Sequence, residues 1–235
     1  MKKINTILAA FGALLMLSVS SANSVEFKVG LSANGMAAYA NAKETLKGDG
    51  AGTGGQTGRT TNEEALLATS FASIFTEVSS SDMMGIGLGI SYAPEVVDLE
   101  KETRVIQPSA TGDSGSQIID GKVQDLLSIY LTMPVSDTGA YVKAGYMQAT
   151  LITSENLATG SKYEDVDMTG MQVGAGYEGS LGDMAFWRAE GSYQMWDDLS
   201  ANGSESNAAT GDDTKNKITA ELGSVMGTFS VGMKF

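Results

Sequence analysis

The chain has 235 residues, a formal net charge of −13, and neither histidine nor cysteine. Without histidine it lacks the usual general base and metal ligand at neutral pH, and without cysteine it has no disulfide or thiol chemistry. We therefore predict that the protein is not an enzyme and holds no cofactor and no dedicated metal site. The acidity excludes nucleic acid as a partner because like charges repel, although acidic loops could hold divalent cations loosely.

The N-terminus has the three parts of a secretory signal peptide. Two lysines follow the first methionine, Ile7–Leu17 is an apolar run too short to span a bilayer stably, and Ser20-x-Ala22 fits a cleavage site. We predict that residues 1–22 are removed, with cleavage after residue 24 as the alternative. Residues 23–235 then form a single domain.

After the signal, apolar side chains recur at every second position in eight stretches, which is the pattern of half-buried β-strands. The third stretch is the cleanest, since Ile86, Leu88 and Ile90 alternate with glycines. The facing of the second stretch is ambiguous, because its phenylalanines fall on the same side as Glu77. We predict strands at residues 25–40, 65–78, 83–92, 122–133, 140–152, 168–178, 184–196 and 218–235.

The connections between these stretches alternate between long and short. We predict long loops at residues 41–64, 93–121, 153–167 and 197–216, and tight turns at residues 79–82, 134–139 and 179–183. None of the three prolines is expected inside a strand. Long loops at one end and tight turns at the other are typical of membrane barrels, whereas a soluble sandwich has no reason to sort its loops. A lipocalin-type soluble barrel is the alternative, but it would expose the glycine face of the third strand.

The last eleven residues, Val225–Phe235, have one apolar face and one small or polar face. Their length suits a tilted strand that crosses a bilayer. The alternation changes phase between Leu222 and Val225, so we expect a β-bulge at Gly223–Ser224. Taken together, the patterns predict an all-β fold, an eight-stranded antiparallel up-and-down transmembrane β-barrel.

The signal peptide, the eight strands, the alternating loop lengths and the terminal F-S-V-G-M-K-F sequence together resemble the small OmpA- and OmpX-like outer-membrane barrels. Segments 140–146, 171–177 and 186–191 look like a type found in marine alphaproteobacteria. The resemblance implies the outer membrane of a Gram-negative bacterium, with outer-membrane lipids and the barrel-assembly machinery as partners. It carries no catalytic motif, and we expect no peptidoglycan-binding domain after the last strand. The implied assembly signal is Phe229, Val231, Met233 and Phe235.

Charged residues share the lumen-facing phase of several strands, and buried charges must pair because an unpaired one is costly. The predicted lumen ion-pair network is Lys28, Glu77, Lys143, Glu178, Arg188, Glu190 and Lys234. It could be a structural plug, or a gated conduit in which Arg188 and Lys143 exchange partners. Outward-facing aromatics suit the membrane interfaces, and those we predict are Tyr92, Tyr146, Tyr177, Trp187 and Tyr193.

These features favour a structural outer-membrane barrel with a largely plugged lumen that displays long acidic extracellular loops. One alternative is porin-like passage of small solutes through the lumen or a lateral opening. Another is adhesion through the loops. A carboxylate-only catalytic site, for example at Asp165 and Asp167, is a weaker interpretation than solvated acidity.

Overall fold

The computed structural model describes residues 25–46, 59–81, 84–106, 115–135, 137–156, 164–206 and 215–235. The predicted signal peptide lies outside these ranges. Within them the chain is almost entirely strand, and no helix is long and apolar enough to cross a membrane. The strands are β1 (Val25–Leu46), β2 (Arg59–Ser80), β3 (Gly87–Ile106), β4 (Gly115–Pro134), β5 (Ala140–Asn156), β6 (Val166–Ser180), β7 (Ala185–Trp196), β8 (Leu199–Ser206) and β9 (Lys215–Lys234).

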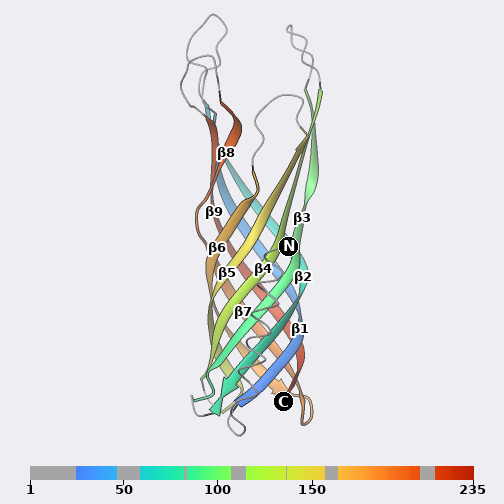
Figure 1. Cartoon of the computed structure of the whole chain (residues 1–235), viewed down its shortest axis with the longest axis vertical. Coiled ribbons are helices and arrows are strands. Elements are labelled where there is room, and N and C mark those ends of the chain that lie inside the picture. The colour runs from blue at the N-terminus through green and yellow to red at the C-terminus, as the bar shows by residue number, and fades with distance from the viewer. Residues whose placement is uncertain are drawn as a thin grey trace, which may run out of the picture.

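The strands form one antiparallel sheet that closes on itself (Figure 1). Each strand from β1 to β7 pairs with the next, β7 pairs with β9, and β9 returns to pair with β1. β8 follows β7 after a break at residues 197–198 and pairs only with the first part of β9. β7 and β8 therefore share one position, and the predicted eight-stranded up-and-down barrel is confirmed.

Several strands are longer than predicted. β3 and β4 extend through most of the expected loop at residues 93–121, and β1 and β2 remain paired out to Leu46 and Arg59. The backbone ladder needs only N–H and C=O groups, so it continues where the side chains no longer alternate in polarity. Alternation is required only where one face meets lipid, which is why the sequence underestimates the strand ends.

The expectation that no proline interrupts a strand is wrong, because Pro94 lies inside β3. β3 pairs with β2 only from Gly87 to Tyr92, and the pairing ends two residues before Pro94. Proline has no N–H to donate, so it belongs on an edge that lacks a partner. On its other side β3 stays paired with β4, through register shifts between Glu95 and Val97 and between Leu99 and Glu102.

The bulge expected at Gly223–Ser224 is absent. β9 pairs without a register shift with both β1 and β7 through this region. Leu222 therefore faces the interior together with the buried Ser224, and Val225 faces outward. The alternation of apolar residues changes phase in the sequence because the interior is apolar around Leu222. The strand itself is regular there.

The outer face of the barrel is apolar, and Leu88, Phe229 and Val231 are 40%, 54% and 47% exposed. The structure also shows which face of β2 points inward, which the sequence left ambiguous. Phe75 and Glu77 are buried in the interior, while Leu66 and Ile74 face outward. Glycines whose missing side chains would point inward leave space for the aromatic rings of the interior. At Gly89, for example, a Cβ atom would overlap the Tyr130 ring.

Candidate functional site

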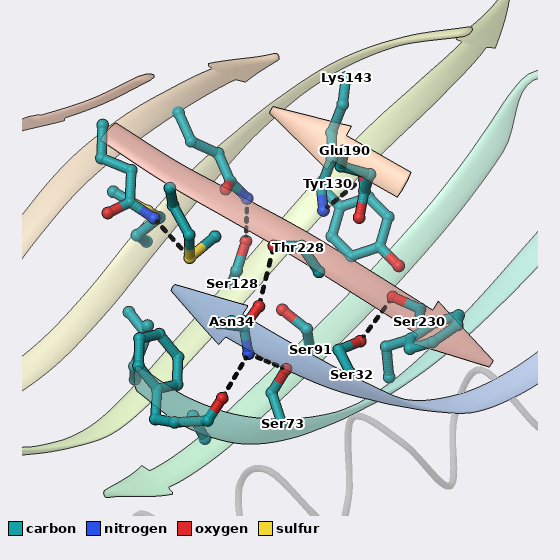
Figure 2. A pocket seen from close by; sticks show the side chains of 18 of the residues that line it. Ser32, Asn34, Ser73, Ser91, Ser128, Tyr130, Lys143, Glu190, Thr228 and Ser230 are labelled. Carbon is teal, nitrogen blue, oxygen red and sulfur yellow. Dashed lines mark hydrogen bonds and ion pairs between the residues drawn. The ribbon is translucent and has the colours of Figure 1, made fainter. Parts of the chain in front are cut away.

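The middle of the lumen is filled by small polar side chains that bond to one another (Figure 2). Thr228 donates a hydrogen bond of 2.9 Å to Asn34 Oδ1, and Asn34 Nδ2 donates one of 2.9 Å to Ser73 Oγ. The Ser32 and Ser230 hydroxyls lie 2.8 Å apart. The cavity among them measures about 30 Å³, roughly the space of one or two water molecules. This level is packed rather than open.

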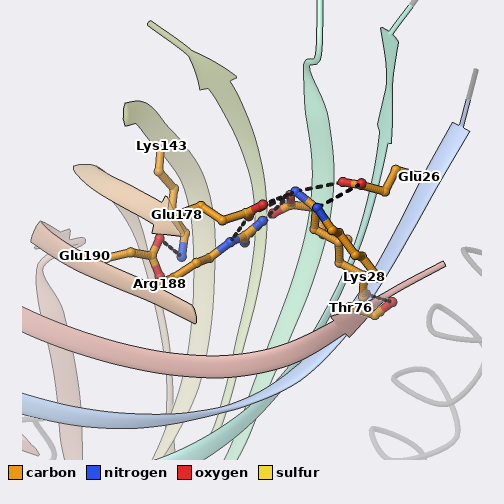
Figure 3. A network of polar contacts seen from close by, with 9 residues as sticks. Glu26, Lys28, Thr76, Lys143, Glu178, Arg188 and Glu190 are labelled. Atoms are coloured by element: carbon orange, nitrogen blue, oxygen red, sulfur yellow. Dashed lines mark hydrogen bonds and ion pairs between the residues drawn. The ribbon is translucent and has the colours of Figure 1, made fainter. Parts of the chain in front are cut away.

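Towards the short-turn end, Arg188 is the centre of an ion-pair network (Figure 3). Its Nη1 and Nη2 atoms donate to the two Glu77 carboxylate oxygens at 2.8 and 2.6 Å, and its Nε donates to Glu178 Oε2 at 2.7 Å. Arg188 and Glu77 are 3% and 1% exposed. Paired donation to a carboxylate is the strongest geometry that arginine offers, so this contact fixes the position of both side chains.

Lysines extend the network in two directions. Lys28 Nζ lies 2.9 Å from Glu178 Oε1 and 3.0 Å from Glu26 Oε1, and Lys234 lies 3.9 Å from Glu26 Oε2. A separate pair joins Lys143 to Glu190 at 3.2 Å. The structure thus brings five of the seven sequence-predicted residues into one connected group and the other two into a neighbouring pair.

Glu26 belongs to the network although it was not among the residues singled out from the sequence. Its signal was present, because Glu26 shares the alternation phase of Lys28 in the first strand. With Glu26 included, the network holds four acidic and four basic side chains. Among the described residues these eight charges therefore balance, so that each buried ion has an opposite charge nearby.

Aromatic rings surround the Arg188 guanidinium. Its Cζ atom lies 5.4, 5.4 and 5.2 Å from the ring centres of Phe75, Tyr141 and Phe186. A cation over an aromatic face is attracted to it, more strongly where water is excluded. The sequence reasoning missed these rings. The available signal was the ambiguous second strand, where Phe75 shares the phase of Glu77.

The predicted interface aromatics lie on the outer face, with one qualification. Tyr146, Tyr177 and Tyr193 are exposed, and Trp187 stacks between Tyr177 and Phe229. Tyr92, however, is partly buried and its hydroxyl donates a 2.6 Å hydrogen bond to Asp125 Oδ1. Asp125 has a positive φ of 57° and lies where the β4–β5 register shifts. Tyr92 therefore anchors an irregular strand as well as facing outward.

The predicted terminal residues close the barrel. Phe229, Val231, Met233 and Phe235 all point outward. The Phe235 N–H donates to the Phe27 carbonyl at 2.9 Å, the Phe27 N–H donates to the Phe235 carbonyl at 3.1 Å, and the two rings lie 6.4 Å apart. The last residue of the chain is thus held by the first described strand.

The carboxylates considered for a catalytic site have other contacts. Asp165 accepts a hydrogen bond of 3.2 Å from the Thr153 N–H, and Asp167 accepts one of 3.1 Å from Thr150 Oγ1. The Asp167 bond joins β5 to β6, and the Asp165 bond joins β5 to the residue just before β6. This arrangement gives each aspartate a structural contact across the hairpin.

Around the ion-pair network the interior is polar, while many large apolar side chains are exposed on the outside, which is the reverse of a soluble protein. The chain is a transmembrane β-barrel. Closed antiparallel barrels of this kind are built for the bacterial outer membrane, so the predicted fold class and outer-membrane location are confirmed.

No protein-family model and no curated protein sequence matches the chain. Its fold is similar to that of solved outer-membrane proteins. OprG from Pseudomonas aeruginosa is 16% identical over 90% of this chain and 96% of its own, with a TM-score of 0.45. Neisserial surface protein A is 12% identical over 87% and 97%, with a TM-score of 0.38. Ail from Yersinia pestis is 13% identical over 88% and 99%, with a TM-score of 0.35. The likeness concerns strand arrangement alone.

Proposed function

We propose that this protein is a structural component of the outer membrane whose lumen is closed to ions and polar solutes and whose long hairpins are presented outside. The observation that carries the proposal is the buried contact between Arg188 and Glu77. Glu178 and three aromatic rings also contact the guanidinium of Arg188. A polar solute would have to separate these groups in order to pass.

Energetics support the plug over the gated conduit. Removing one partner of a buried ion pair costs about 3–5 kcal/mol, because the other charge is left without compensation. In a conduit, Arg188 and Lys143 would have to exchange partners during opening. Lys143 is already held by Glu190, and its Nζ lies 4.1 Å from the centre of the Tyr130 ring. Exchange would therefore break two favourable arrangements at once.

Surface display is part of the same proposal. On β1 the outward face changes from Ala37 and Tyr39 to the exposed Asn41 and Lys43, and the strand continues to Leu46. The outer ends of β1 and β2 thus form a polar hairpin that extends above the apolar face. Adhesion through such hairpins is the second candidate function. If it is correct, deleting the loops between paired strands should abolish binding to a host or neighbouring cell surface.

The proposal also covers the export and assembly of the protein. We propose that residues 1–22 direct export, that the barrel-assembly machinery recognises the outward residues from Phe229 to Phe235, and that outer-membrane lipids surround the barrel. The pairing of Phe235 with Phe27 supports recognition of the C-terminus, since that end completes the closure. We also propose that the protein is of the type found in marine alphaproteobacteria.

Single-channel recording in planar bilayers tests the closed lumen. We expect the wild-type barrel to show no stable openings, and the double variant Arg188→Ala with Glu77→Ala to show small but resolved current steps. The matched control is Lys122→Ala with Glu95→Ala, which removes a solvent-exposed pair with a 2.9 Å contact and should remain silent. Stable, substantial wild-type openings would overturn the proposal. Heat-modifiable gel mobility verifies that each variant is folded.

A further inference from the structure

The outer half of the barrel contains a cavity of about 270 Å³ that is lined almost entirely by apolar groups. Its walls come from inward positions of most strands and include Met36, Leu67, Val97, Leu126, Trp196 and Leu222. An apolar cavity of roughly 150 Å³ is already large enough to remain dry and bind benzene. The space here is therefore large enough for a molecule of two rings or a segment of hydrocarbon chain.

The cavity is closed below and irregular at its side. Beneath it lie the polar level and the ion-pair network described above. Beside it, β2 and β3 separate, because their pairing ends at Ile74 and Tyr92 whereas β1 accompanies β2 along its whole length. Leu67 and Val97 lie beyond this point on the two separated strands, and both line the cavity. The separation therefore leads directly into the apolar space.

Two local irregularities accompany the separation, which we call the β2–β3 seam, and one side-chain hydrogen bond bridges it. Pro94 has no N–H with which to continue pairing. The irregularity near Asp125, held by the Tyr92 hydroxyl, shifts the alternation of β4, so that Val123 as well as Leu126 lines the cavity. Across the seam, the Thr69 hydroxyl donates a 3.1 Å hydrogen bond to the Val96 carbonyl, so a side chain replaces part of the missing backbone ladder. A single side-chain bond is weaker than a ladder and can open locally.

The seam lies at the level of the lipid. On the outward face of β2, the residues beyond Ile74 are Ala72, Ser70, Ala68 and Leu66, and the first charged residue, Glu64, follows only after them. Leu66 is 83% exposed, which suits a hydrocarbon environment and not water. In barrels with short periplasmic turns, this upper part of the belt meets the outer leaflet. An apolar molecule dissolved in that leaflet would encounter the seam without crossing water.

We propose that the cavity is a binding site for a small, neutral, apolar molecule that enters from the outer leaflet through the β2–β3 seam. The apolar lining favours such a molecule over a charged one, because desolvating a charge without a partner is costly. An occupant also supplies the dispersion contacts that atoms lining a void lack. The polar level and the ion-pair network stop it from continuing to the periplasm. The site does not depend on whether the protein has a structural or an adhesive role.

The two tryptophans of the chain make binding measurable. Trp196 lines the cavity and Trp187 stacks on the outer face, so a Trp187→Phe background leaves a single reporter inside. In phospholipid vesicles, 1-bromonaphthalene should quench Trp196 saturably, because bromine quenches indole on contact. Negatively charged 4-bromobenzoate should leave the emission unchanged. Equal quenching by both probes, or quenching that never saturates, would overturn the proposal.

Cavity-filling and seam-closing variants separate the site from its route. Ala220→Phe, inside the cavity, should weaken saturable quenching at least fivefold, while the matched Ala72→Phe on the lipid face should not change it. Because the chain has no cysteine, Thr69→Cys with Val96→Cys places one thiol on each side of the seam, and loss of free thiol on oxidation verifies the cross-link. Oxidation should slow quenching by membrane-dissolved probe at least tenfold, with the reduced form as control. Unchanged rates on oxidation would refute entry through the seam, and an Ala220→Phe variant that binds normally would refute the site.

A variant that fails to fold is recognised by heat-modifiable gel mobility and does not enter the comparison. Leu222→Ala offers a second measurement in the opposite direction, since it enlarges the cavity without adding bulk. We expect it to admit a larger probe, 9-bromoanthracene, that the parent protein binds at least fivefold more weakly. Identical binding of this probe by the parent and Leu222→Ala would contradict the assignment of the site.

Discussion

Replacing Arg188 by methionine tests the energetic argument for the ion-pair network. The change removes three charge-assisted hydrogen bonds, two to Glu77 and one to Glu178. Glu178 keeps Lys28 at 2.9 Å, whereas Lys28 lies 4.0 Å from Glu77. Most of the loss therefore falls on Glu77, which is left buried with a poorly compensated charge. We expect the free energy of unfolding to fall by about 3–5 kcal/mol.

A second variant separates the cost of an orphaned charge from the loss of packing. Adding Glu77→Gln to Arg188→Met removes the uncompensated carboxylate, and replacement of a whole buried pair is often close to neutral. The double variant should recover most of the lost stability. As a surface control, Lys122→Met breaks the exposed contact with Glu95 and should cost about 1 kcal/mol or less.

Urea titration of the barrel folded into lipid vesicles, followed by tryptophan fluorescence, gives these free energies from the linear dependence on denaturant. The reasoning is refuted if Arg188→Met costs no more than the Lys122 control. It is also refuted if the double variant is less stable than Arg188→Met alone, because the orphaned carboxylate would then not be the source of the loss.

Two further variants test local packing by the same titration. Gly89→Ala should destabilise the barrel by about 1–3 kcal/mol because its Cβ would overlap the Tyr130 ring. Gly35→Ala has open space around the new atom and should be neutral, so equal effects would contradict the packing argument. Tyr92→Phe removes the hydrogen bond to Asp125 and should cost about 1–3 kcal/mol, and an unchanged midpoint would show that this bond does not stabilise the barrel.

The sequence was sufficient for the parts of the barrel in which one face meets lipid. There, a period of two is forced on residues such as Leu88 and Val231, so the number of strands and their facing could be predicted. Charges in the opposite phase, such as Lys28 and Arg188, could then be assigned to the interior. The partners could not be predicted, because which acid meets which base depends on strand register and side-chain reach.

Two further errors have different causes, and the first is the assumption that the interior is polar throughout. Leu222 breaks the expected alternation, and a bulge was invoked to return it to the outer face, although it lines an apolar cavity instead. The second is the expectation that no proline lies inside a strand, which fails at Pro94 because β3 has no partner on one side there. Both residues mark the region where the barrel departs from a regular cylinder, and this is the region that we propose as a binding site.

The contact between Phe27 and Phe235 has a consequence for the order of biogenesis. β1 is the first described strand to leave the ribosome and its partner β9 is the last, so one edge of β1 stays unpaired until β9 has been made. An unpaired strand edge beside an apolar face is prone to aggregation. The time needed to deliver β9 therefore sets how long that edge of β1 stays open to other chains.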